Sequence, residues 1–392
     1  MGRSALTLIL WMTVIAWAIA CAWDYDTLAI EAKGKFNEVH AMTGRFDRYP
    51  PLYYEMRLAR VKKLIAKNPS DWEAYDAAAV ASDKLGKFDE AVEWMEKKER
   101  QLKDGGVSPT SNRDAWYRYH ANIGTIYAHR WFATGANKKQ DIDLITAEGH
   151  IARAIEINPD AHFGREIVQL EVLRWLIASN AADRKGEDHE TLTSHLTGEA
   201  EIDLEKNIKG LIGIIIMGSG WNSVDVFSTL GDLLEWRGDS YLAFLAKSRA
   251  VELWAGGSFS MGAGLTHKDA NLKESIDIDP EELMIEDESD KARVRSQYAA
   301  LRQNANQWHY FRTAFMEDQL KKGRHPDTHN EFWKGYQEVP AIHLTDFGDS
   351  NGEDEWMAWA GGVGGIGAIG AIAGYATLRL RRRRAAFPPP AG

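Results

Sequence analysis

Apolar residues recur at helical spacing along most of this 392-residue chain, and most clearly at residues 68–98. Two apolar stripes flank Gly86 in this stretch. The first stripe consists of Trp72, Tyr75, Ala79 and Ser82, and the second of Phe88, Ala91, Val92 and Met95. Each set lies on one face of a helix. Asp71 is placed to cap the first helix, and Gly86 suits the left-handed turn after it. The pattern therefore predicts a hairpin of two antiparallel helices.

This stretch also resembles one tetratricopeptide repeat, a 34-residue helix–turn–helix unit. The residues that match the family's large and small positions are Tyr75, Ala78, Ala79, Gly86, Phe88 and Ala91. Two features depart from the family: Lys98 stands where a small residue is usual, and no proline closes the unit at 102–103. Because one unit cannot bury its apolar face alone, the resemblance implies neighbouring units in a solenoid. It also implies protein binding rather than catalysis.

Two further segments resemble the repeat, so the clearest units are 68–102, 117–159 and 224–253 within an irregular array at 23–255. In the middle unit, Gly124 and Ala147 are 23 positions apart, where the family has about 12. A longer loop is therefore expected there. Strand-like alternation is nearly absent. We predict an all-α fold: a TPR-like array of helical hairpins followed by a single C-terminal transmembrane helix.

The N-terminal residues have the pattern of a secretory signal peptide, which we place at 1–22 with cleavage before Trp23. Arg3 precedes an apolar run that ends in small residues. Two alternatives stay open: an uncleaved anchor helix, and lipid attachment at Cys21, since the residues before it loosely resemble a bacterial lipobox. Cys21 is the only cysteine. A chain cleaved before Trp23 therefore forms no disulfide and has no cysteine-based site.

Residues 356–378 carry no charge and are long enough to cross a bilayer, so we predict a transmembrane helix there. An acidic linker at 346–355 precedes it, and the basic tail at 379–392 is expected in the cytoplasm. The expected location is the bacterial inner membrane, crossed once, with the body in the periplasm or outside. Two small-xxx-small pairs allow close helix packing within the span, namely Gly361 with Gly365 and Gly370 with Gly374.

The glycine-rich span leaves several alternatives open. It could pair two copies of the chain in a homodimer, or hold the chain as a subunit of a membrane complex. A glycine-rich span with an arginine tail also resembles bacterial C-terminal sorting signals, which are cut and transferred. Before the span, we expect an acidic connector at 256–284 and a helical region at 285–345 that caps the array.

Charge is distributed very unevenly along the chain. All 57 acidic residues lie between positions 23 and 355, together with 41 of the 47 basic ones, so this part has a net charge near −16. Nucleic-acid binding is disfavoured, because phosphate contacts need a basic surface. A basic protein or peptide partner, or simple solubility, fits the charge.

Candidate sites for chemistry are weak, and we predict no catalytic residue, cofactor or metal. Residues 277–288 have acidic side chains at calcium-loop spacing, but Glu282 stands where the loop needs glycine. His325 and His329 are four apart around Pro326, which usually marks a loop. A Gly-x-Gly-x-x-Gly match at 362–367 lies inside the expected span rather than after a strand. An envelope enzyme or metal-dependent factor with a site near 277–331 is kept as an alternative.

The family's usual binding surface is the concave face, formed by the first helix of each unit. Carried over by register, this face contains Asp76, Val80, Asp83 and Lys84, then Arg118, Ala121, Thr125 and His129, then Asp225, Ser228, Asp232, Glu235 and Trp236. Exposed acidic and tryptophan side chains would suit a basic, partly apolar peptide. The alternative for each of them is a solvated helix face. We expect a membrane-tethered, outward-facing scaffold for protein interaction or complex assembly.

Overall fold

A computed structural model describes residues 37–135, 141–159, 165–181, 190–198, 203–217, 220–258, 260 and 288–343. The expected signal peptide, transmembrane helix and basic tail lie outside these residues, as do the four glycines of the span and nearly all of the connector at 256–284. None of the helices within the described residues is long and apolar enough to cross a membrane.

Every regular element in the described residues is helical, which confirms the all-α prediction. The helices are α3 (Glu38–Thr43), α4 (Pro51–Lys67), α5 (Trp72–Lys84), α6 (Phe88–Asp104), α7 (Arg113–Ala133), α8 (Ile142–Ile157), α9 (Arg165–Ala181), α10 (Leu192–Thr197), α11 (Leu204–Met217), η3 (Gly220–Asn222), α12 (Val224–Arg237), α13 (Ser240–Ala255) and α15 (Glu288–Lys321).

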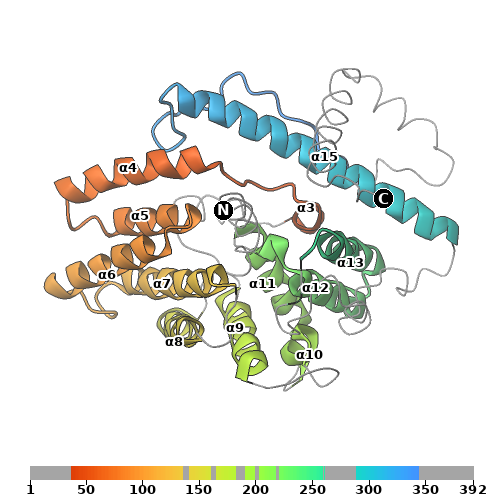
Figure 1. Cartoon of the computed structure of the whole chain (residues 1–392), viewed down its shortest axis with the longest axis horizontal. Helices are drawn as coiled ribbons and strands as arrows, with labels where there is room; N and C mark the ends of the chain where they lie inside the picture. Colours follow the sequence, from red (N-terminus) through yellow and green to blue (C-terminus); the bar gives the residue numbers. More distant parts are fainter. Residues whose placement is uncertain are drawn as a thin grey trace, which may run out of the picture. The chain divides into compact units, whose positions relative to one another are not determined.

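Adjacent helices stack in pairs, and the most extensive contacts join α5 to α6, α7 to α8 and α12 to α13 (Figure 1). These are the helices of the three segments that resemble the repeat. Gly86 and Gly238 turn the chain within two of the pairs, with φ of +72° and +93°, which glycine adopts without strain. The stacked pairs are compatible with a helical-repeat fold.

The array is continued by α4, α9 and α11. Helix α4 packs on α5, and α9 and α11 connect α8 to α12. Small residues allow close approach between α4 and α5, where Ala74 and Ala78 lie fully buried against Leu58 and Val61. Each such pair of helices stabilises the fold by burying apolar surface, which contributes roughly 25 cal/mol per Å².

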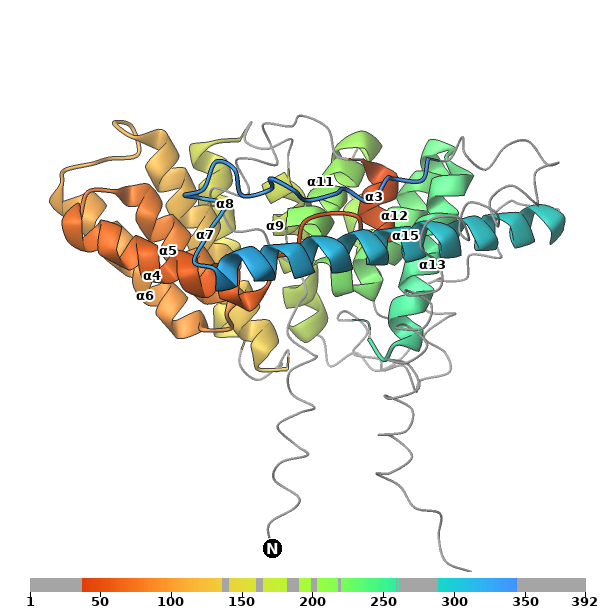
Figure 2. The same ribbon diagram turned by 90° about the horizontal axis from the view of Figure 1, so that it is seen from above.

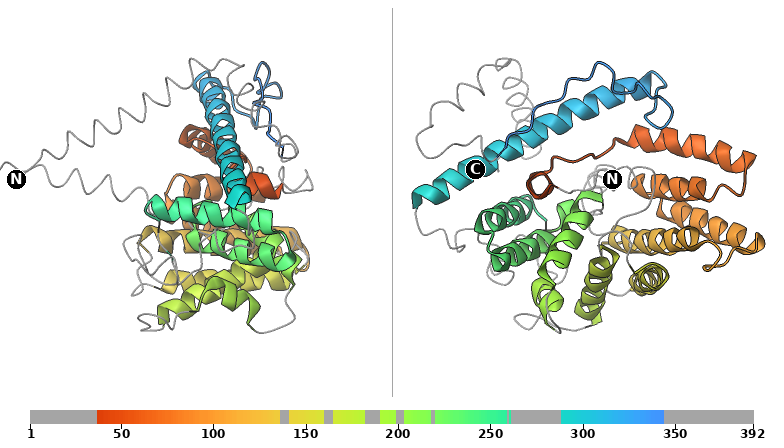
Figure 3. Two further views of the ribbon diagram at one scale, coloured as in Figure 1. Left: turned by 90° about the vertical axis from the view of Figure 1, so that its right-hand side faces the viewer. Right: turned by 180° about the vertical axis from the view of Figure 1, so that it is seen from behind.

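Helix α15 lies across the array and contacts α4 as well as α3 and α13, so it reaches both the first and the last helices of residues 51–255 (Figure 2; Figure 3, right). We expected the region at 285–345 to cover one terminal apolar face. In the structure, Met316 and Leu320 of α15 and Phe332 after it pack on Tyr53 of α4. The buried Arg57 of α4 donates to Asp327 as well, at 2.9 Å from Nε and 2.7 Å from Nη2.

Candidate functional site

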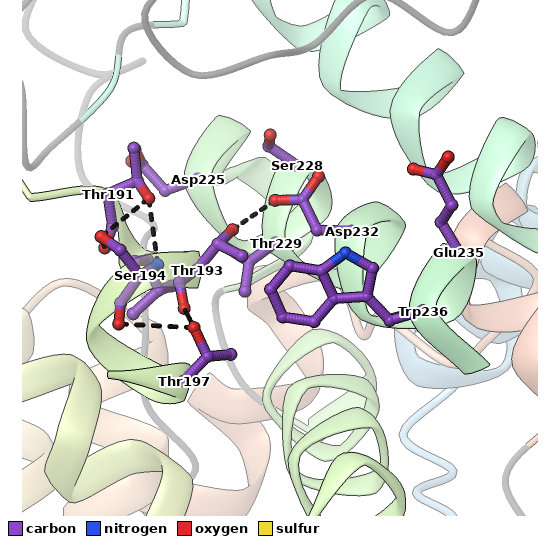
Figure 4. Close-up of a pocket in the computed structure, with 11 residues that line it drawn as sticks. Thr191, Thr193, Ser194, Thr197, Asp225, Ser228, Thr229, Asp232, Glu235 and Trp236 are labelled. Carbon is purple, nitrogen blue, oxygen red and sulfur yellow. Dashed lines mark hydrogen bonds between the residues drawn. The ribbon is translucent and has the colours of Figure 1, made fainter. Parts of the chain in front are cut away.

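A pocket of about 330 Å³ opens between α10 and α12 (Figure 4). Hydroxyl groups and carboxylates dominate its wall, with one indole ring at the side. The lining residues are Thr191, Leu192, Thr193, Ser194, Thr197, Asp225, Ser228, Thr229, Asp232, Glu235 and Trp236. Five of them belong to the face predicted for the third unit: Asp225, Ser228, Asp232, Glu235 and Trp236. The structure therefore brings this part of the predicted face together at one pocket.

Helix α12 presents its polar face to the pocket because its apolar face is buried on α13. Ser223 starts the helix, since its hydroxyl accepts a hydrogen bond from the Val226 amide at 3.2 Å. Phe227, Leu230 and Leu234 are fully buried. Residues 225, 228, 232 and 235 follow the spacing of the opposite stripe, so their side chains share one face.

The other wall is the short helix α10, whose hydroxyl side chains face α12. Thr191 caps this helix by accepting a hydrogen bond from the Ser194 amide at 3.1 Å. Thr193 donates from Oγ1 to the carboxylate of Asp232 and also lies 3.1 Å from Thr229 Oγ1 (Figure 4). These hydrogen bonds fix the distance between the two walls.

The electrostatic balance of the lining is negative. It contains three carboxylates and, among the described residues, no lysine or arginine. Behind the wall, the buried Lys247 donates from Nζ to Asp232. Ser260 donates to Asp225 at 2.5 Å. Counted over the described residues alone, one cation lies against three carboxylates, and this balance favours a cationic ligand group.

The side chain of Lys247 packs closely against Gly231 where it reaches Asp232. A Cβ at Gly231 would lie 2.7 Å from Lys247 Cγ and 2.9 Å from its Cε. The absence of a side chain at Gly231 therefore leaves room for a charged side chain at the base of the pocket.

Trp236 and Glu235 lie at the mouth of the pocket, at the end of α12. The Trp236 side chain is 52% exposed, which is unusual for so large an apolar group. Its indole ring lies next to Asp232 in Figure 4, while Glu235 extends from the same turn of the helix. An exposed indole beside carboxylates is a suitable contact for a guanidinium or ammonium group.

The other predicted face residues lie elsewhere, and the structure differs from the expectation of exposure for three of them. Asp76, Asp83 and His129 are buried. Asp76 accepts hydrogen bonds from Lys98, and His129 Nδ1 lies 2.7 Å from Asp83 Oδ1. These side chains are held by neighbouring helices, so they stabilise the contact between units.

The remaining members of the face are half-buried or buried as well. Arg118 pairs with Asp114 at 2.9 Å, and Gln169 donates to the buried Thr125 at 3.1 Å. Lys84 is half-buried, while Val80 and Ala121 belong to the core. None of these residues lines the pocket.

The metal alternative gains no support from the part of the chain that the structure describes. Among these residues, no three His, Cys, Asp or Glu side chains are grouped so that they could hold a metal ion. His325 is buried and uses both ring nitrogens: Nδ1 accepts from the Asp327 amide and Nε2 donates to the Tyr53 carbonyl, each at 3.1 Å. The acidic positions 277, 279 and 281 lie outside the described residues.

The side of the pocket that α10 forms is not predicted by the sequence pattern. The segment at 191–197 has four hydroxyl side chains within seven residues, and this density was the signal that could have indicated it. A helix of six residues gives too short a pattern to predict its orientation.

Comparison with known proteins finds no family model that matches the chain, and no curated protein or solved structure with significant similarity. The functional interpretation therefore depends on the chemistry of the pocket and on the pairing of the helices.

Proposed function

We propose that the chain is a TPR-like scaffold that holds a basic, partly apolar segment of another protein in the pocket between α10 and α12. The observation that carries the proposal is the exposed Trp236 beside Glu235 and Asp232 in a hydroxyl-lined pocket. A lysine or arginine head group would pair with the carboxylates, while its aliphatic stem would lie on the indole. Such cation–π contacts contribute about 0.5–2 kcal/mol, depending on how well the site excludes water.

The overall charge supports the same kind of partner. The body between positions 23 and 355 is near −16, so a basic segment is attracted over distance before it docks. The hydroxyl groups of Ser194 and Thr197 donate to backbone carbonyls of their own segment, so their oxygens can accept hydrogen bonds from the amides of an extended peptide. We expect the interaction to weaken as salt rises.

The membrane part of the proposal comes from the sequence. The apolar run at 5–20 and the uncharged run at 356–378 favour export of the body and anchoring in the bacterial inner membrane. The scaffold would then hold its partner at the outer surface of that membrane. Assembly through the glycine pairs at 361/365 and 370/374 would add a second contact, to another copy or to a partner span.

A photo-crosslinking amino acid placed at position 236 in the native cell tests the proposal. We expect a cross-linked segment that is rich in lysine or arginine, and we expect Glu235→Gln introduced into the same chain to reduce its yield. The matched control places the same amino acid at Tyr310, an aromatic residue of α15 that is 67% exposed. Cross-links to acidic segments, or identical products from both positions, would contradict the proposal.

A further inference from the structure

A second charged site lies away from the pocket, around Trp221 of η3. Three guanidinium groups surround its indole ring, one from each of three different segments. The Cζ atoms of Arg249, Arg48 and Arg302 lie 3.8, 5.0 and 5.1 Å from the ring centroid. Arg48 comes from the segment between α3 and α4, Arg249 from α13 and Arg302 from α15. We call these three residues the arginine cluster.

Among the residues that the structure describes, one carboxylate forms ion pairs with the arginine cluster. Glu252 accepts from Arg302 at 2.9 Å from Nε and 2.8 Å from Nη2, and from Arg249 Nη1 at 3.0 Å. The nearby Asp47 is bound by Arg312 instead. Within the described residues, no carboxylate forms an ion pair with Arg48. Counted over the part of the chain that the structure describes, the cluster therefore has two positive charges in excess.

Two buried donors in the arginine cluster have no acceptor among the described residues. Nη1 of Arg48 and Nε of Arg249 are buried and form no hydrogen bond with the described residues. Arg249 as a whole is only 6% exposed. The ring face of Trp221 attracts a cation, but it cannot satisfy a donor the way an oxygen atom does.

Burial and the excess of positive charge lower the pKa of two groups, one within the arginine cluster and one beside it. Burial, and then the charges of Arg302 and Arg249, lower the pKa of Arg48 to about 10. Burial, and then the charge of Arg48, lower the pKa of His309 to about 4. Like charges held together at low water content are destabilising unless a counter-charge neutralises them.

We propose that the arginine cluster binds a small dianionic oxyanion of the phosphate class, as the free ion or as a monoester. The two excess charges match a dianion, and planar guanidinium groups suit the oxygen spacing of phosphate. The side chain of Glu252 is 41% exposed and Arg48 is half-buried, so solvent reaches the edge of the cluster at these two residues. This site is independent of the peptide pocket.

Thermal unfolding of the purified full-length chain in detergent tests the proposal, with sodium phosphate compared with sodium chloride at equal ionic strength and pH. At ten times its Kd, phosphate should raise Tm by about 3 °C. Arg48→Gln should abolish the rise. Arg153→Gln, at an exposed arginine of α8, should keep it. A parallel titration with glycerol 3-phosphate distinguishes the two ligands. An equal rise in Tm with glycerol 3-phosphate indicates that the site accepts a monoester, whereas a rise with inorganic phosphate alone indicates that it accepts the free ion.

A second variant keeps the test decisive even where Arg48→Gln folds poorly. Glu252→Gln removes the competing carboxylate, so calorimetry should show tighter phosphate binding than in the unaltered chain. In chloride, Arg48→Gln should be at least as stable as the unaltered chain, because repulsion is relieved. The proposal is overturned by the absence of a phosphate-specific rise in the unaltered chain, by a rise that survives Arg48→Gln, or by weaker binding in Glu252→Gln.

Discussion

Lys98 donates hydrogen bonds from Nζ to both carboxylate oxygens of Asp76, each at 2.7 Å, between α6 and α5. Both side chains are buried, and Asn122 of α7 donates to the same carboxylate at 2.9 Å. The pair therefore links three consecutive helices. A buried ion pair therefore occupies the position of Lys98, where the resemblance to the tetratricopeptide family predicts a small residue.

Lys98→Met should destabilise the fold by about 3–5 kcal/mol, because the buried Asp76 loses its counter-charge. A urea denaturation series measures the change. The control is Lys103→Met, at an exposed lysine on the same helix, which should change stability by less than about 0.5 kcal/mol.

The double variant Lys98→Met with Asp76→Leu should recover much of this loss, since removing both charges leaves an apolar contact. A double variant that is less stable than Lys98→Met alone would show that the single loss came from packing rather than from charge.

Two glycines of the α7–α8 pair should respond to alanine in opposite directions. A Cβ at Gly124 would lie 3.0 Å from the backbone oxygen of Ala147 and from Ile151, so Gly124→Ala should destabilise by about 1–3 kcal/mol. Gly149 is exposed and has nothing within 4 Å, so Gly149→Ala should stabilise by up to about 1 kcal/mol through helix propensity. Equal effects of the two substitutions in thermal unfolding would contradict the close packing at Gly124.

The imidazoles of His120 and His150 meet with their Nδ1 atoms 2.9 Å apart. Burial, and then the charges of His150 and Arg153, lower the pKa of His120 to about 3. Burial also lowers the pKa of His150, although Glu99 opposes this shift. Below about pH 6.5 the unfolded chain binds more protons than the folded one, so stability is lost as pH falls from about 6.5 toward about 3.

We expect the pair to account for about 2 kcal/mol of the stability lost between about pH 7 and about pH 5, after allowance for its partial exposure. Urea midpoints at both pH values measure the loss. His120→Gln with His150→Gln should remove this part of the pH dependence. An unchanged loss in the double variant would assign the pH dependence to other groups.

Asp327 fastens the segment after α15 to α4 through Arg57 and Arg60. Burial tends to raise the pKa of Asp327, but the hydrogen bond and charge of Arg57 outweigh it, so the net pKa is lowered. Asp327→Asn should cost about 2 kcal/mol and make the segment at 323–343 more sensitive to limited proteolysis. Asp318→Asn, at an exposed position on α15, is the matched control; equal proteolysis of both variants would contradict the role of Asp327.

Local signals in the sequence were enough to predict the helical hairpins. Helix α5 begins at Trp72 after Asp71, whose side chain accepts from the Ala74 amide at 3.2 Å, and the chain turns at Gly86. The helix cap, the apolar stripe and the turn glycine all lie within or next to the helix that they define. They can therefore be recognised from the local sequence alone.

Contacts between distant segments could not be predicted in the same way. Arg57 and Asp327 are 270 positions apart, and nothing near either residue indicates the other. The same limit applies to the pocket: residues of α12 are predicted as part of a binding face, whereas no signal in the sequence places α10 beside them. It applies again to Asp76 and Asp83, whose polarity suggested exposure although partners on neighbouring helices bury them.

Peptide-display selection on the full-length chain tests the central claim most directly, because the natural partner does not have to be identified first. On the unaltered chain we expect peptides enriched in lysine or arginine next to aromatic or aliphatic residues. The enrichment should fall with salt and be lost on the Glu235→Gln, Trp236→Ala variant, while Tyr310→Ala retains it. Selection of acidic peptides, or of the same peptides on the pocket variant, would contradict the account.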